Sequence, residues 1–264
     1  MALYADLFRY RELFLNLFQR ELRTRYRGTV LGLGWTLVNP LALVGVYTLV
    51  FSVLWKAASV RHYPLFVVSG LAVWIFFQSS VQMASHSLLG QASLVRQVRF
   101  PRQLVPLAVV ASNLVAYLAM LLVVVPINLV LVPRTRETFW AVIPLSLPLV
   151  ALTSGLAMVF AAATVFFRDV EYLLLTILLP WFFLTPVLYE LRSLPGVRDH
   201  PTLTDVLHWA NFVTPVVETI RAPLFYGNFA GLGDFVYTIL AALAALALGA
   251  YVFARADDQL AIQL

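Results

Sequence analysis

Residues 23–55 read RTRYRGTVLGLGWTLVNPLALVGVYTLVFSVLW, and they place three arginines just before a long apolar run. From Thr29 to Trp55 there is no Asp, Glu, Lys, Arg or His. At about 1.5 Å per helical residue, this run is long enough to cross the roughly 30 Å hydrocarbon core of a bilayer. Because basic flanks tend to stay in the cytoplasm, we expect a cytoplasmic N-terminus and a first span that runs outward.

The composition of the whole chain agrees with a membrane protein. Of its 264 residues, 61% are hydrophobic and only 12% are charged, whereas a soluble domain carries about a quarter charged residues. The net charge of +5 comes from arginines that cluster beside apolar runs, which is typical of topology determinants. We therefore predict an all-α integral membrane protein with no nucleic-acid partner.

The chain reads as one membrane domain, residues 1–264. Apolar residues recur at steps of three and four near the N-terminus, which predicts an amphipathic helix in the membrane interface over residues 1–28. Five transmembrane helices are expected within residues 29–189, and a sixth, followed by an inner tail, within 235–264. The segment 190–234 alternates apolar pieces with charges and prolines, so we expect short helices there, on the outer face or dipping back into the bilayer where protein or water covers their backbone. Both termini are then cytoplasmic. The six predicted spans are residues 29–55, 65–83, 104–132, 139–167, 172–189 and 235–253.

Several classes of transporter and enzyme are disfavoured by what the predicted spans lack. None of the six carries an Asp, Glu, Lys, Arg or His in its apolar interior, whereas ion-coupled carriers usually keep such groups near mid-membrane. The only lysine, Lys56, follows Trp55, so no phosphate-binding loop exists. His200 and His208 are the only histidines with even a weak metal-ligand spacing, and we expect no metal site. An active transporter of this kind needs power from another polypeptide.

The inner segment 91–102, QASLVRQVRFPR, is the candidate contact with the polypeptide that supplies this energy. A short amphipathic helix between two spans can dock in a groove of a partner and push on both spans. The alternative is a basic loop that only obeys the positive-inside rule. Sequence spacing leaves both open.

Three motifs give the chain a resemblance to a known family. They are RTRYRGTVLGLGWTLVNP (residues 23–40), LVRQVRFPRQLVPL (94–107) and FFRDV (166–170). They resemble the sequence hallmarks of permease subunits of type-2 ABC transporters, specifically the exporters of O-antigen, capsule and teichoic acid polysaccharides. The resemblance covers the chain in order, from the amphipathic helix through six spans to the short helices before the last one.

This resemblance implies an assembly and a division of labour. The chain would be a transport subunit rather than an enzyme, forming a homodimer in the bacterial inner membrane that binds two copies of an ATP-hydrolysing subunit. ATP and Mg would bind that partner, leaving no cofactor on this chain. Short gate helices within residues 185–229 would face the exterior. The implied coupling helix to the ATPase comprises Leu94, Val95, Arg96, Gln97, Val98, Arg99 and Phe100.

Substrates of the family are long glycans on an undecaprenyl diphosphate lipid, which suggests two sets of contacts. Arg23, Arg25 and Arg27 suit the diphosphate, because guanidinium groups bind phosphates in bidentate fashion. Anchoring to anionic lipid headgroups would select the same arginines. Aromatic faces suit the apolar faces of sugar rings, although most membrane aromatics serve interface belts or helix contacts. The candidates for a glycan path are Trp35, Phe51, Trp74, Phe77, Trp181, Phe182 and Tyr189.

Two other functions stay open from the residues alone. A membrane glycosyltransferase or ligase acting on a lipid-linked sugar needs a catalytic pair on the outer face, where Glu190, Asp199, Asp205 and Glu218 are available without a recognisable motif. The second alternative is a scaffold or channel that works without energy input. Co-elution with an ATP-hydrolysing partner distinguishes both from the exporter.

Overall fold

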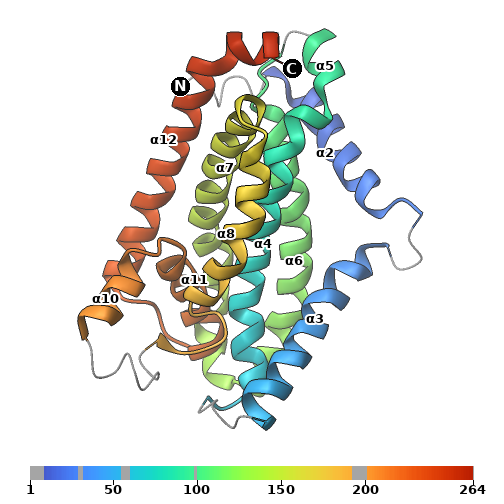
Figure 1. Cartoon of the computed structure of the whole chain (residues 1–264). Coiled ribbons are helices and arrows are strands. Elements are labelled where there is room, and N and C mark those ends of the chain that lie inside the picture. Colours follow the sequence, from blue (N-terminus) through green and yellow to red (C-terminus); the bar gives the residue numbers. More distant parts are fainter. Residues whose placement is uncertain (1–8, 29–31, 55–59, 98–99, 192–200, 264) are drawn as a thin grey trace.

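The computed structural model describes residues 9–28, 32–54, 60–97, 100–191 and 201–263, and these residues form helices without strands (Figure 1). The predicted all-α membrane fold is thereby confirmed. The long helices are α3 (Trp35–Thr48, continued by the π-helical η2, Leu49–Leu54), α4 (Tyr63–Gly90), α6 (Leu104–Leu131), α7 (Val142–Phe166) and α12 (Leu232–Gln263). The shorter helices are α2 (Arg11–Tyr26), α5 (Ala92–Gln97), α8 (Asp169–Leu184), α10 (Pro201–Trp209) and α11 (Val213–Arg221). Single turns are η1 (Gly32–Gly34), η3 (Pro133–Glu137), η4 (Phe139–Ala141) and η6 (Ala222–Tyr226).

Five helical stretches in the described residues are long and apolar enough to cross a bilayer. They are Trp35–Leu54, Tyr63–Gly90, Leu104–Leu131, Phe139–Phe166 and Leu232–Ala256, and they agree with five of the predicted spans. The remaining predicted span corresponds to α8, which has 16 residues. A helix of that length covers only about 24 Å, so a sixth full crossing stays a prediction.

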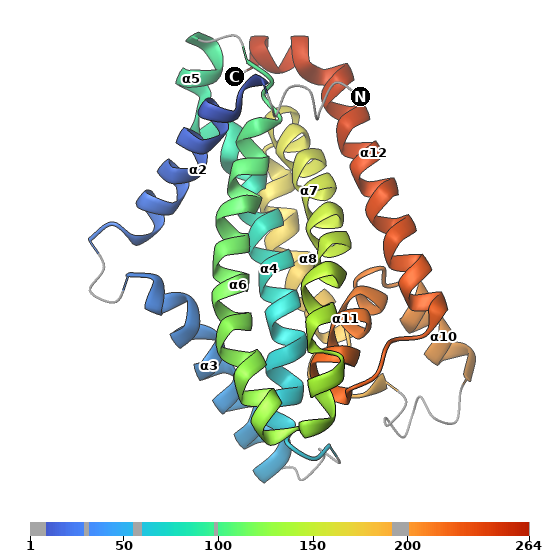
Figure 2. The same cartoon turned by 180° about the vertical axis from the view of Figure 1, so that it is seen from behind.

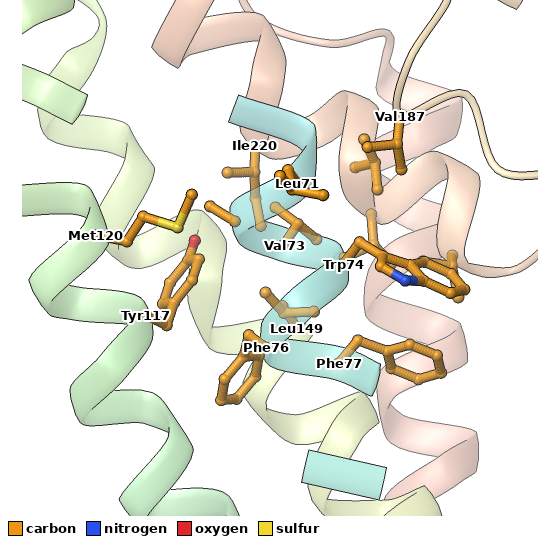
Figure 3. Packing of buried hydrophobic residues seen from close by; sticks show 14 of the residues in the cluster. Leu71, Val73, Trp74, Phe76, Phe77, Tyr117, Met120, Leu149, Val187 and Ile220 are labelled. Atoms are coloured by element: carbon orange, nitrogen blue, oxygen red, sulfur yellow. The ribbon is translucent and has the colours of Figure 1, made fainter. Parts of the chain in front are cut away.

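Helix α4 lies at the centre of the bundle, with α6, α7 and α8 around it (Figures 1 and 2). Pro64 stands in its first turn, where a missing backbone N–H does no harm. Its large side chains are buried on several sides. Trp74 and Phe77 point to one side of α4, while Phe76 points toward Tyr117 of α6 (Figure 3). A helix that is apolar all round in this way is a core helix.

Helices α7 and α12 pack backbone to backbone through glycines. A Cβ added at Gly155 would lie 2.2 Å from the carbonyl carbon of Ala245, and one at Gly249 would lie 2.6 Å from the carbonyl oxygen of Gly155. Small residues allow such close approach, and in a bilayer this van der Waals contact is a main source of helix association. The spacing of these helices therefore depends on two residues without side chains.

The bundle has two different ends. The start of α2, the helix α5 and the end of α12 share one end, whereas α10 and α11 lie in the opposite half (Figure 1). At the α5 end a separate apolar cluster joins α2, α5, α6, α7 and α12. In it Leu17 of α2 is buried against residues of the bundle. The predicted amphipathic helix is confirmed for the part that is described, and its apolar face covers protein.

The C-terminal third of the described residues gives detail that the sequence left open. The expected inner tail is helical where it is described, since residues 254–263 continue α12. The short helix α11, expected on the outer face or dipping back under a cover of protein, is almost wholly buried and contacts α4, α7 and α12. The apolar periodicity of Val213, Val216, Val217 and Ile220, with exposed fractions of 0%, explains this burial.

Candidate functional site

The arginines near the end of α2 divide into two groups. Arg25 turns toward the bundle and donates a hydrogen bond from Nη1 to Oδ1 of Asn113 on α6. Arg20 and Arg23 on another face of α2, and Arg27 directly after its end, line a hollow of about 370 Å³. Their spacing of three and four residues places these guanidinium groups on one stripe. The structure therefore brings together two of the three predicted diphosphate contacts, and its placement of Arg25 does not support the third.

Arg20 was missed by the sequence analysis. Its spacing from Arg23 and Arg27 is the signal that identifies it, since residues i, i+3 and i+7 share one face of a helix. The other residues lining the hollow are Asn16, Gln19 and Thr24. All are hydrogen-bonding side chains, and no acidic residue lines the hollow. Such a set suits an anionic oxygen ligand.

The predicted coupling helix, residues 94–100, overlaps α5 at residues 94–97, and its described apolar residues face inward. Val95 is 2% exposed and Phe100 is 7% exposed, both in the cluster at the α5 end, while Leu94 is half-buried. Ser93 and Gln97 are exposed. The side chain of Arg96 and residues 98–99 lie outside the described part. The buried placement of Val95 and Phe100 does not support direct contact of those two with a partner.

A hydrogen bond connects α5 to α2. Gln91 immediately precedes α5 and donates from Nε2 to Oε1 of Glu21, at a distance of 3.0 Å. Gln91 is 5% exposed, so the bond is shielded from water and stronger for it. This bond is a direct contact between the residue before α5 and the helix that carries the arginine stripe.

The predicted glycan-path aromatics lie in different environments. Trp74 and Phe77 are each 1% exposed, and both pack edge-on or tilted against Trp181. Phe182 is also buried. Side chains enclosed by their own chain cannot touch a polymer passing along its surface, so this placement does not support a path role for these three buried residues.

The remaining candidates are more accessible. Trp35, at the start of α3, is 51% exposed. Phe51, Trp181 and Tyr189 are half-buried. Trp181 donates from Nε1 to Oδ1 of Asn211, 2.8 Å away, so its orientation is fixed by the loop before α11. Of the predicted set, Trp35 offers the most surface to a ligand.

A buried arginine at the end of α11 escaped the sequence analysis. Arg221 is 0% exposed and donates to the backbone oxygens of Pro186 and Val187 at 2.7 and 3.1 Å. Its guanidinium also lies 4.1 Å from the ring centroid of Phe66 on α4. Directly beside it is Gly70, where a Cβ would lie 2.0 Å from Nη2. Sequence analysis treated segment 190–234, which contains this arginine, only as a region of short helices.

Glu218 is the acidic partner of this arginine. Its Oε1 lies 3.1 Å from Nη1 of Arg221. Burial raises the pKa of Glu218, and the positive charge of Arg221 partly offsets that rise. The pair fixes the end of α11 to α4 and to the turn after α8. This turn was expected to belong to the gate region.

The structure describes the other two predicted outer-face acids, Glu190 and Asp205, whereas Asp199 lies outside the described residues. Glu190 accepts a hydrogen bond from the hydroxyl of Tyr226, and Asp205 is exposed on α10. His208 lies 2.5 Å from Oδ1 of Asp234 at the start of α12, while its predicted weak metal partner His200 is outside the described residues. Among the residues described, no group of three or more His, Cys, Asp or Glu is arranged to hold a metal ion.

Comparison with known proteins shows the family of the chain. The family model "ABC-2 type transporter" matches residues 12–225. An "O-antigen export system permease protein RfbA" of Myxococcus xanthus is 37% identical over 198 residues, which are 74% of this chain and 74% of that protein. A protein of the same description from Klebsiella pneumoniae is 26% identical over 204 residues, 75% of this chain and 78% of that protein. The protein therefore belongs to the ABC-2 type transporter family, as a multi-pass inner-membrane transport subunit that works with an ATP-binding partner.

Proposed function

We propose that this chain is the membrane subunit of an ATP-driven exporter that moves an O-antigen-like polysaccharide, carried on undecaprenyl diphosphate, out of the cytoplasm. The observation that carries the proposal is similarity to O-antigen export permeases along three quarters of the chain. The arginine stripe on α2 supports the lipid diphosphate as the anchor of the substrate. The proposed assembly is a homodimer with two ATP-binding subunits.

The proposed orientation places the α5 end in the cytoplasm. Support comes from Arg11 in the first turn of α2, whose start lies at that end (Figure 1), and from Arg102, which precedes α6. Retention of basic segments in the cytoplasm is the rule for short flanks of membrane helices. In this orientation Ser93 and Gln97 meet the ATP-binding subunit, and α10 and α11 lie in the outer half.

Reconstitution tests the proposal directly. The chain and its ATP-binding subunit are placed in vesicles together with lipid-linked polysaccharide, and delivery of glycan is measured. We expect delivery only with both subunits and hydrolysable ATP. Equal delivery from vesicles that lack the ATP-binding subunit would contradict an ATP-driven exporter and favour a channel.

Exchange of Arg23 and Arg27 for glutamine is expected to slow export by about tenfold. Loss of exposed charge-assisted contacts of roughly 1.4 kcal/mol in total corresponds to that factor. Arg11→Gln serves as the matched control, because this exposed arginine of α2 does not line the hollow. Export rate and membrane insertion are measured for both. The same slowing in the control would assign the arginines to lipid anchoring in general.

Tryptophan at Ser93 or Gln97 is expected to abolish co-purification with the ATP-binding subunit. These side chains are exposed one helical turn apart, so a bulky ring would block docking without disturbing the fold. Glu137→Trp, an exposed position in η3 at the other end of α6, is the control. Affinity purification followed by quantification of the partner measures the effect. Undiminished recovery with both variants would place the docking surface elsewhere.

A further inference from the structure

The outer half of the molecule contains a cavity that the proposed function does not use. It has a volume of about 650 Å³ and lies among the turn after α8, α10, α11, η6 and the start of α12. Sites for small ligands commonly occupy about 300–1,000 Å³. This cavity therefore has the capacity of a small-molecule site, and it shares no lining residue with the hollow at the arginine stripe.

The cavity is lined by aromatic faces as well as polar groups. Trp209, Tyr226 and Phe229 contribute rings from α10, η6 and the loop that follows η6. Trp209 is fixed by a ring contact of 5.4 Å to Tyr237, and Phe229 by one of 6.3 Å to Trp140. Exposed rings held in place in this way offer apolar faces to a ligand at a small cost in conformational entropy.

The polar lining is acidic. Four carboxylates border the cavity: Glu190, Asp205, Glu218 and Asp234. Arg221, the nearby cation, is completely buried behind Glu218. Because like charges repel, this lining disfavours a diphosphate and favours a ligand that donates hydrogen bonds.

The carboxylates are held in place for such a ligand. Glu218 is fixed by Arg221, Asp234 by His208, and Glu190 by the hydroxyl of Tyr226. A carboxylate has about four acceptor positions, so Glu218 and Asp234, each held by one cationic or imidazole partner, keep capacity to accept from ligand hydroxyl or ammonium groups. Acceptors beside aromatic faces match a sugar ring, which has donor groups at its rim and apolar C–H faces.

We infer that this cavity binds one or two neutral or amino-sugar units of the transported glycan after they have passed the membrane core, separately from the site for the lipid diphosphate. The inference rests on the proposed function for the identity of the ligand. The acidic cavity would be a second contact with the substrate, opposite in charge to the basic arginine stripe. The arginine stripe selects the anionic anchor, and the acidic cavity accepts the uncharged or cationic sugars.

Saturation-transfer NMR on the purified full chain with its ATP-binding subunit tests the inference. The probes are methyl α-mannopyranoside, methyl β-galactopyranoside, N-acetylglucosamine and glucosamine. At least one is expected to give a signal in the wild type. That signal should fall at least about fivefold in Asp205→Asn/Phe229→Ala, since one ring contact and one charged acceptor are lost. Both positions are exposed, so folding should persist.

Leu232→Ala is the control variant, because this side chain is 78% exposed and does not line the cavity. It should keep the wild-type signal, and an equal concentration of pyrophosphate should not displace the sugar. Absence of signal for all four probes, an unchanged signal in the double variant, or displacement by pyrophosphate would overturn the inference. A protein that exports glycan but gives no signal refutes the cavity site alone. One that binds sugars but does not export refutes the proposed function alone.

Discussion

Methionine in place of Arg221 is expected to lower the melting temperature by about 10 °C and to abolish export. The substitution leaves Glu218, whose side chain is 26% exposed, without its cationic partner, and breaking a pair with one fully buried member costs about 3 kcal/mol, the lower end of the range for buried ion pairs. It also removes the donors to Pro186 and Val187. Thermal unfolding of the purified protein, followed by tryptophan fluorescence, measures the loss of stability.

A second substitution separates charge from packing. In Arg221→Met/Glu218→Gln no buried charge is left alone, so the double variant should be more stable than Arg221→Met. Arg61→Met is the control, because this arginine is exposed. Gly70→Ala should also destabilise the protein, since a Cβ there overlaps the guanidinium. Equal stability of Arg221→Met and Arg61→Met would contradict a structural role for the buried pair.

Leucine in place of Gly155 is expected to prevent stable assembly of the bundle. Its Cβ alone would lie 2.2–2.5 Å from backbone atoms of Ala245 and Leu246, which cannot move unless α12 moves as a whole. The two helices would be forced apart, and the van der Waals contact that holds them together in the bilayer would be lost. The amount of monodisperse protein recovered after detergent extraction measures the effect.

Gly45 supplies a matched glycine control for that experiment. It lies within α3, and a Cβ added there meets no atom within 4 Å. Gly45→Leu should therefore be extracted normally, and Gly45→Ala should favour the helix slightly. If Gly155→Leu were as stable as Gly45→Leu, the close contact between α7 and α12 would not limit assembly.

The sequence predicted the long elements well because their signals are strong. Runs without charge, ended by arginines or prolines, predicted α4, α6, α7 and α12 close to their observed starts. The start of α6 at Leu104, directly after QVRFPRQ, agrees with its prediction. Hydropathy reports how a segment partitions into lipid, and it depends only on the residues of that segment.

The parts that sequence could not predict depend on contacts between distant segments. Arg221 lies in a polar-looking segment, and only the fold brings it against Phe66 and Val187. The separation of Arg25 from its neighbouring arginines depends on Asn113, which is remote in the chain. Trp74 and Trp181 were grouped as path aromatics by type, yet Trp74 is enclosed in the core. Burial of an aromatic side chain depends on its neighbours in space.

The short helix α8 has a consequence for the surrounding lipid. Apolar side chains are exposed along its length in the single chain, among them Leu173, Leu179 and Phe183. Its length of about 24 Å is several Å less than an average hydrocarbon core, and wherever acyl tails reach the helix such a mismatch thins the bilayer locally, at a cost of fractions of a kcal/mol per Å.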